Sequence, residues 1–422
     1  MQSSRLIALD LLRGITIFLM VVVNNPGSWD AVYPFLEHAE WNGCKLADFV
    51  FPFFILIMGI AIPLAISTKE NQKLNFTKIL TRSIRILSLG LFLNFFTKIS
   101  IGEVTGIWLV LIKLILTVII GYALMGNYNA KFKLYIALII FGGFLILAFT
   151  TSTYAEARLM GVLQRIGIVY GVTALLFLTV SQRIQIGIVL LILLGYWITM
   201  AIIPFPGLEK ANFEKGTNIA AWIDQIILGN HVYIGTKPWD PEGILSTFPA
   251  IAQSMIGCLI GQLVLDSFST IHLLKKLMYY AFAFIALGLF WSYGFPINKS
   301  IWTSSFVIYT TGAAILIFVL LSYFADYKNY KKGINPILAW GVNPMIVFFL
   351  SGIISRTLAE IKFADPENSL NSISLQGYIY QYGIEPYFSN PMNASLTYTL
   401  LYISVLNWIL FFLFKNKIII KV

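Results

Sequence analysis

The sequence predicts an all-α polytopic membrane protein with about 12 (11–12) transmembrane helices and both termini in the cytoplasm. Of its 422 residues, 58% are hydrophobic and 11% are charged, too few charges for a soluble fold to cover its surface. The mean hydropathy is +0.80. Apolar runs long enough to cross about 30 Å of hydrocarbon recur along the chain. They are predicted to be helices, because lipid offers no partner to open backbone groups and no run alternates as a barrel strand does.

Twelve apolar runs are predicted as spans, and the number between residues 99 and 160 is left open. The first run is not a signal peptide, because Asp10 and Arg13 interrupt it and no small-residue cleavage site follows. The spans in chain order are 5–25, 46–67, 78–98, 105–126, 132–150, 160–180, 184–203, 245–265, 275–294, 300–323, 335–357 and 395–415.

The Lys and Arg residues predict the orientation of these spans. They concentrate in short connections on the side of the N-terminus, whereas the opposite side is rich in Asp and Glu. The positive-inside rule therefore places both termini in the cytoplasm. Three longer segments, 26–45, 204–244 and 358–394, then lie outside the cytoplasm, where long loops usually carry function. Residues 1–422 are predicted to form a single transmembrane domain.

Several function classes are excluded by what the sequence lacks. The cysteines, Cys44 and Cys258, give neither a disulfide framework nor metal-ligand spacing, and the three histidines form no metal motif. We therefore expect no metal. The basic residues lie between apolar runs and form no patch, so no nucleic-acid partner is expected.

Ionisable side chains inside the spans are functional candidates, because their burial in lipid costs several kcal/mol. Asp10 and Arg13 lie at i, i+3 on one helix face, either as a structural ion pair or as the lining of a polar cavity that opens to the cytoplasm. Arg165 either faces the interior, where it could hold an anion or a carbonyl group, or snorkels to the outer interface. Lys113 is interpreted as snorkelling or lining a cavity.

His38 is the leading catalytic candidate, because histidine can take and return a proton near neutral pH. It lies in the first outer loop, close before the span that carries Asp48. The alternative is a surface histidine without a role. Asn24, at the outer end of the first span, could stabilise an oxyanion or could cap the helix. His231 could bind substrate or be structural.

Ordered motifs along the chain resemble the heparan-alpha-glucosaminide N-acetyltransferase family. The stretch from Leu9 to Phe54 is the most specific part of this resemblance. The motifs are Leu9–Gly14, Val23–Asn24, His38–Gly43, Ala47–Phe54, Gly161–Gly167, Asp224 with Leu228–Gly229, Asp240–Thr247 and Trp340–Pro344.

The resemblance implies a multi-span enzyme that moves an acetyl group from cytosolic acetyl-CoA across the membrane to the amino group of a terminal glucosamine. It implies that the family's active-site histidine and its partner asparagine match His38 and Asn24, and that its buried charged positions match Asp10, Arg13 and Asp48. The luminal N-terminal domain of the animal enzyme has no counterpart in this sequence, so a bacterial-type member is expected.

The candidate residues form three groups. The catalytic group is His38 and Asn24, and no metal ligand is expected. The acetyl-CoA group is Asp10, Arg13 and Arg165. The acceptor-binding group is Asp48, Trp41, Asn42, His231, Asp240, Glu242 and Asn343.

The predicted function is an acyl-CoA-dependent N-acetyltransferase of the bacterial inner membrane, with the His38 loop in the periplasm. Its partners would be membrane lipid and a glucosamine-type sugar or cell-wall fragment as acceptor, and a homodimer is compatible with it. Direct transfer and an acetyl-histidine intermediate both fit. The alternatives are a secondary transporter of an amino sugar, whose polar site should lie near the midplane, and a non-catalytic scaffold subunit.

Overall fold

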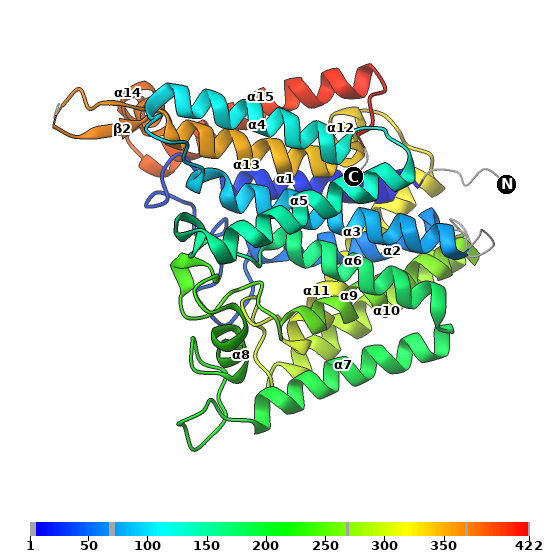
Figure 1. Cartoon of the computed structure of the whole chain (residues 1–422). Coiled ribbons are helices and arrows are strands. Elements are labelled where there is room, and N and C mark those ends of the chain that lie inside the picture. Colours follow the sequence, from blue (N-terminus) through cyan, green and yellow to red (C-terminus); the bar gives the residue numbers. More distant parts are fainter. Residues whose placement is uncertain (1–5, 67–71, 267–269, 368–369, 421–422) are drawn as a thin grey trace.

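The computed structural model describes residues 6–66, 72–266, 270–367 and 370–420. Within these ranges eleven helices are long and apolar enough to cross a membrane, and a bent pair of helices raises the number to 12. The predicted all-α polytopic class is confirmed (Figure 1). The long helices are α1 (Ile7–Asn24), α2 (Val50–Ala65), α3 (Gln72–Phe95), α4 (Gly106–Met125), α5 (Ala130–Thr150), α6 (Val162–Thr179), α7 (Gln182–Ile202), α9 (Thr247–Asp266), α10 (Ile271–Trp291), α11 (Ser304–Leu321) and α15 (Pro391–Lys415).

The span predicted over 335–357 is a bent pair of helices. It consists of α12 (Asn335–Val342) and α13 (Pro344–Glu360), which meet at 82°. Pro344 has no backbone N–H and begins the new helix, as proline does at a first helical position. The Asn343 side chain joins this break to the C-terminal segment, since its amide donates to the Ile418 carbonyl and accepts from the Ile420 N–H, each at 2.9 Å.

The remaining elements are short. A 3₁₀ turn, η1 (Leu46–Phe49), precedes α2, and a π-helical turn, η5 (Ser322–Tyr327), follows α11. The other elements are η2 (Phe96–Lys98), η3 (Ser152–Tyr154), α8 (Ile219–Leu228), η4 (Ile234–Thr236), the antiparallel pair β1 (Lys362–Ala364) and β2 (Ser372–Ser374), α14 (Leu375–Gly383) and η6 (Glu385–Tyr387).

Glycines let the inner helices approach closely. A Cβ atom on Gly59 of α2 would lie 2.1 Å from the Ser254 carbonyl oxygen of α9, and one on Gly341 of α12 would lie 1.9 Å from the Asp10 carbonyl oxygen of α1. Membrane helices pack in this way because small residues allow backbone-to-backbone contact. Helices α4, α5, α7 and α10 are largely exposed and surround this inner group.

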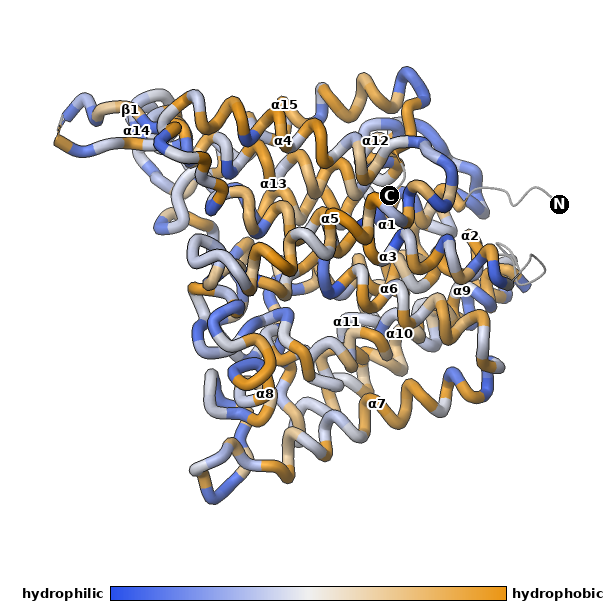
Figure 2. Tube along the Cα trace, viewed as in Figure 1, coloured by the Kyte–Doolittle hydropathy of each residue, from blue (hydrophilic) through white to orange (hydrophobic). Residues whose placement is uncertain are grey.

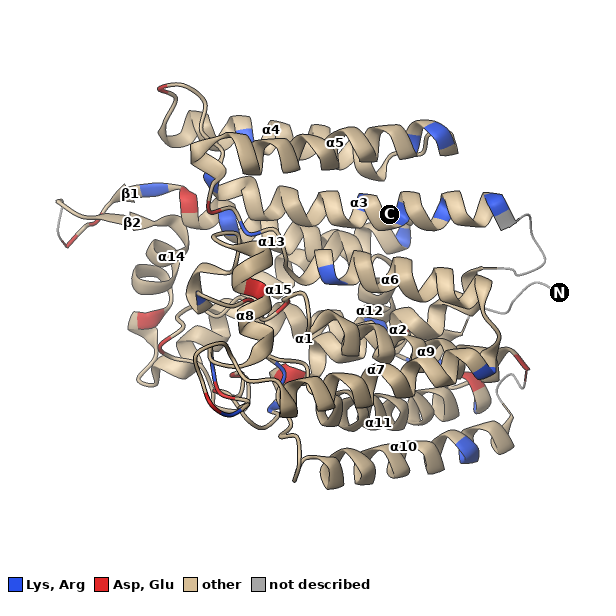
Figure 3. Cartoon of the chain, turned by 60° about the horizontal axis from the view of Figure 1, so that its bottom comes forward, with Lys and Arg blue, Asp and Glu red and all other residues tan. Residues whose placement is uncertain are grey.

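The molecule has two different ends. Mostly short connections and the start of α1 lie at one end, here called the terminal end, whereas α8, α14 and the β-hairpin lie at the other, the loop end (Figure 1). The hydrophobic residues concentrate between the two ends (Figure 2). Basic residues mark the terminal ends of α3, α5 and α10, and many acidic residues lie at the loop end (Figure 3). This separation of charge agrees with the predicted orientation, in which the terminal end is cytoplasmic.

Candidate active site

The centre of the candidate site is His38 and the carboxylate of Asp48. Asp48 lies in η1 and is buried, and its Oδ1 is 2.8 Å from Nδ1 of His38. The other carboxylate oxygen accepts from the backbone N–H groups of Ala39 at 3.0 Å and Lys45 at 2.9 Å. With Nδ1–H donating to the carboxylate, the lone pair of the imidazole is on Nε2, the arrangement that a general base needs.

Lys299 completes this cluster and was missed by the sequence analysis. It follows α10 in the chain, and its Nζ lies 3.0 Å from Nδ1 and 3.3 Å from Nε2 of His38 and 3.5 Å from Oδ1 of Asp48. Burial lowers the pKa of Lys299, and the nearby carboxylates of Asp48 and Glu242 partly offset this effect. Other lysines, such as Lys45 and Lys362, lie on the same acid-rich side, so no local signal in the sequence distinguishes Lys299.

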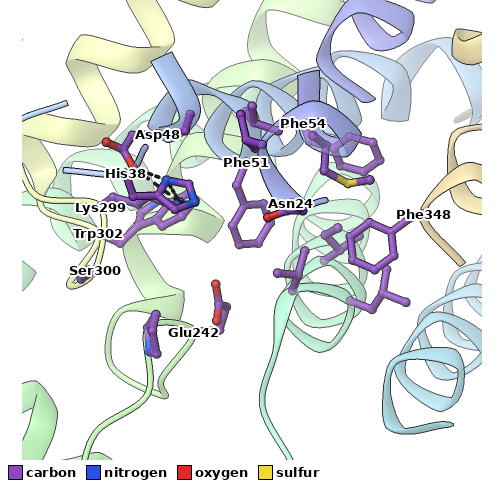
Figure 4. A pocket seen from close by; sticks show the side chains of 18 of the residues that line it. Asn24, His38, Asp48, Phe51, Phe54, Glu242, Lys299, Ser300, Trp302 and Phe348 are labelled. Carbon is purple, nitrogen blue, oxygen red and sulfur yellow. Dashed lines mark hydrogen bonds and ion pairs between the residues drawn. The ribbon is translucent and has the colours of Figure 1, made fainter. Parts of the chain in front are cut away.

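These side chains line a cavity of about 330 Å³, which we call the reaction chamber (Figure 4). Asn24 lines it from the end of α1, and Phe54 and Phe348 form part of its apolar wall. The Asn24 amide has no hydrogen-bond partner among the described residues, so it can donate into the chamber. The neighbouring Asn25, whose amide donates to the Val21 carbonyl at 2.9 Å, closes the end of the helix instead.

A charged network holds Glu242 at the edge of the reaction chamber. Arg158 donates to both carboxylate oxygens of Asp240, from Nε at 2.8 Å and from Nη2 at 2.5 Å, and also contacts Glu242. Burial alone would raise the pKa of Glu242, but Arg158 and Arg165 hold it below its usual range. Glu242 and Arg158 line the chamber, whereas Asp240 is buried behind them.

Asp224 of α8 also binds the loop that carries Glu242. Its two oxygens accept from the backbone N–H groups of Asp240 at 3.2 Å and Ile244 at 2.9 Å. Burial, together with the charge of Asp240, raises the pKa of Asp224 to about 6, although these hydrogen bonds act in the opposite direction. The loop that carries Glu242 is thus held by backbone contacts as well as by Arg158.

Arg165 lies behind the chamber wall, which corrects the expectation that it lines a cavity. It is fully buried, so it does not snorkel. Its Nη2 donates to the carbonyl groups of Pro241 and Gly243 at 3.0 and 3.4 Å and to the Ser246 hydroxyl. Its guanidinium stacks over the Trp302 ring at 4.9 Å. Arg165 therefore positions the loop of Glu242.

A second cavity of about 350 Å³, here called the inner chamber, reaches toward the terminal end. Arg13 and Arg82 line it, and the predicted pair of Arg13 with Asp10 is present at 2.8 Å. Asp10 itself is buried and does not line the chamber. The inner chamber and the reaction chamber share the apolar side chains of Phe54, Ile166 and Met345, which therefore form a narrow wall between them.

Two of the proposed acceptor contacts in the first loop lie at or near the reaction chamber. Trp41 lines it, and its indole N–H donates to the Phe213 carbonyl at 2.9 Å. Asn42 does not line the chamber; its amide oxygen accepts from Asn298 at 3.2 Å, which connects the loop to the segment of Lys299.

Two further predicted acceptor contacts are placed elsewhere, and this corrects their assignment. His231 is buried outside the chamber, with Nδ1 2.8 Å from the Ala157 carbonyl oxygen. Asn343 lies at the break between α12 and α13, where the C-terminal segment uses both groups of its amide. Both polar side chains satisfy backbone groups, so they are structural.

Comparison with known proteins agrees with the motifs. Residues 5–160, which include Asp10, Arg13, Asn24, His38 and Asp48, match the model of the family described as heparan-alpha-glucosaminide N-acetyltransferase, catalytic. The chain is 26% identical over 396 residues to human heparan-alpha-glucosaminide N-acetyltransferase and 25% identical over 397 residues to the mouse protein. Each match covers 82% of this chain and 52% or 53% of the relative, so the chain spans about half the length of these relatives. These matches confirm the resemblance of the chain to the heparan-alpha-glucosaminide N-acetyltransferase family.

Proposed function

We propose that this protein is a transmembrane acetyltransferase that transfers an acetyl group from acetyl-CoA to an amino sugar at the loop end. The observation that carries the proposal is the His38–Asp48 pair, which faces a chamber that a thin apolar wall separates from a second chamber toward the other end. The names of the human and mouse relatives agree with this reaction.

The inner chamber suits the donor. Acetyl-CoA carries phosphates that cannot cross lipid, and Arg13 and Arg82 offer guanidinium groups that bind phosphate well. The uncharged pantetheine arm would pass the apolar side chains of Phe54, Ile166 and Met345, and the thioester would then enter the reaction chamber. This route places the acetyl donor on the cytoplasmic side, with the acceptor on the other.

In the reaction chamber the acceptor, which has lost one proton to solvent and is present as the neutral amine, attacks the thioester carbonyl carbon while His38 Nε2 takes a second proton from its nitrogen. The C–N bond forms, the C–S bond breaks, and the proton on His38 passes to the departing CoA thiolate. The Asn24 amide donates to the oxyanion of the tetrahedral intermediate. Transfer through an acetyl-histidine intermediate uses the same groups, with His38 as the nucleophile.

We place the protein in the bacterial inner membrane, with the loop end in the periplasm. The charge distribution of Figure 3 supports this orientation. The homodimer stays a prediction. The acceptor is a glucosamine-type sugar or a cell-wall fragment, small enough to bring its amine to His38.

The direct test measures transfer of labelled acetyl groups from acetyl-CoA to glucosamine by the purified full chain in detergent. The His38→Ala variant should lose on the order of 10²- to 10⁴-fold in kcat, the usual contribution of a general base. His272→Ala is the matched control, because His272 is exposed at the start of α10. Full activity of His38→Ala would refute the proposal, and uptake of unmodified sugar into vesicles without acetylation would favour the transporter.

A further inference from the structure

A third cavity of about 210 Å³ lies beside the reaction chamber, and the chemistry described above does not use it. We call it the side chamber. It shares Asn24 and Arg158 with the reaction chamber, so the two cavities meet at these side chains. Its other polar lining residues are Asn25, Asn94, Gln164, Ser351, Ser355 and Arg356. None of the side chamber's lining residues belongs to the inner chamber, so it is separate from the proposed donor route.

The side chamber is lined by Arg356, whose guanidinium forms no ion pair within the described part of the chain. Arg356 donates from Nη1 to the Gly352 carbonyl of its own helix, at 3.0 Å. The carboxylate one turn further on, Glu360, is held by Lys113, whose Nζ is 2.8 Å from both of its oxygens. No Asp or Glu of the described residues lines the chamber or pairs with Arg356. Such a guanidinium favours an anionic ligand.

Gln164 supplies a second, independent indication of a ligand. It is 3% exposed and lines the side chamber, and its Nε2 has no hydrogen-bond partner among the described residues. An amide donor buried without a partner costs free energy, which a ligand acceptor would recover.

The start of α6 adds further donors at the same place. Its N-cap is Gly161, which has no side chain to accept from the first N–H groups, and Val162, Leu163 and Gln164 all line the chamber. The positive end of the helix dipole favours an anion here. Gly90 keeps the Gln164 side of this region open, since a Cβ atom on it would lie 2.7 Å from Oε1 of Gln164.

We propose that the side chamber binds a carboxylate, sulfate or phosphate substituent of the acceptor sugar through Arg356, Gln164 and the N-terminus of α6. This inference rests on the proposed function, because it requires the amine of the same acceptor to reach His38. Asn24 lies between the two positions and would face the sugar ring. The acceptor is then an anionic amino sugar.

The test compares equilibrium binding of glucosamine and glucosamine 6-sulfate to the purified full chain, without acetyl-CoA. The sulfated sugar should bind on the order of tenfold to a hundredfold more tightly, the range expected for hydrogen bonds to a charged group. Arg356→Gln should remove this advantage, Arg356→Lys should keep part of it, and Gln164→Glu should weaken binding of the sulfated sugar selectively. Lys362→Gln is the matched control, an exposed cation at the same end of the molecule.

Equal binding of the two sugars, or an advantage that survives both Arg356→Gln and Gln164→Glu, would overturn the proposal. A competition experiment with bound inorganic sulfate gives a further check. If acetyl-CoA displaces the sulfate and the sulfated sugar does not, the side chamber belongs to the donor, and the proposal is overturned. Binding is measured without acetyl transfer, so the two proposals can fail separately. If the sulfated sugar binds selectively but is not acetylated, the acetyltransferase proposal fails and the anion site remains.

Discussion

Asp48 is the residue on which the geometry of the active site depends. One of its oxygens binds His38 and the other binds two backbone N–H groups of the first loop. The carboxylate therefore fixes both the orientation of the imidazole and the fold of the loop that carries it. Lys299 is close enough to contact both members of the pair.

We expect Asp48→Asn to lower kcat on the order of 10²-fold or more, because an amide can also donate to Nδ1 and so favour the tautomer without a lone pair on Nε2. The KM for acetyl-CoA should change little, since Asp48 does not line the inner chamber. The measurement is steady-state kinetics of acetyl transfer for Asp48→Asn and for the control variant Glu37→Gln. Glu37 is a carboxylate of the same loop, and it pairs with Lys45 at 3.1 Å. Equal rates for the two variants would contradict the assigned role.

Asp224 predicts a pH dependence of stability. Its pKa is about 6 in the folded protein against 3.8 for the free group, so the folded state binds more protons between these values. The contribution of Asp224 to the free energy of unfolding is therefore highest at low pH. It declines as the pH rises from about 4 to 6, at about 1.4 kcal/mol per pH unit and by about 3 kcal/mol in total. Asp224→Asn should remove this decline.

The measurement is thermal unfolding in detergent from pH 4 to pH 7 for the wild type and Asp224→Asn. The lost backbone hydrogen bond gives the variant an offset that does not depend on pH, so the slope is the quantity to compare. Parallel curves would show that the carboxyl group does not titrate in this range.

The sequence was sufficient to select His38, Asp48 and Asn24, which line one cavity, because they lie within 25 residues of one another and in recognisable motifs. It was not sufficient for Lys299 or Arg356, which reach their cavities only through the packing of distant helices. It also misassigned Asn343, since nothing local shows that residues 418 and 420 use its amide.

At the scale of helices, hydropathy predicts spans well because each span must be long and apolar whatever its neighbours are. The bend between α12 and α13 is not predicted by hydropathy. The run 335–357 is predominantly apolar, and its break at Asn343 and Pro344, where the Asn343 side chain contacts the C-terminal segment, does not show in a hydropathy average. A hydropathy profile also does not show which glycines contact another helix, although these contacts help to determine which helices pack together.

Gly341→Ala should destabilise the protein by about 1–3 kcal/mol, because its Cβ atom would collide with the Asp10 carbonyl oxygen, which belongs to a rigid helix. Gly142→Ala is the control, since a Cβ atom there has nothing within 4 Å and alanine favours the helix. Thermal unfolding in detergent distinguishes the two. A stabilised Gly341→Ala variant would show that α1 and α12 do not approach so closely.

At the scale of the whole molecule, the proposed function assigns one reactant to each end. The inner chamber, with Arg13 and Arg82, opens toward the terminal end, and the reaction chamber lies at the loop end. A transporter would expose one site alternately to both sides. Here His38 and its partners lie at one end only, which favours chemistry on a substrate that stays on its side.

Sidedness of transfer in sealed liposomes tests this account most directly. Chains are inserted in one orientation, verified by protection of the loop end from external protease, with the acceptor sugar enclosed on the loop side and labelled acetyl-CoA supplied on the terminal side. The account predicts labelled sugar inside, with acetyl-CoA remaining outside, and no product in His38→Ala liposomes. Product formation only when acetyl-CoA and sugar share the loop side would contradict it.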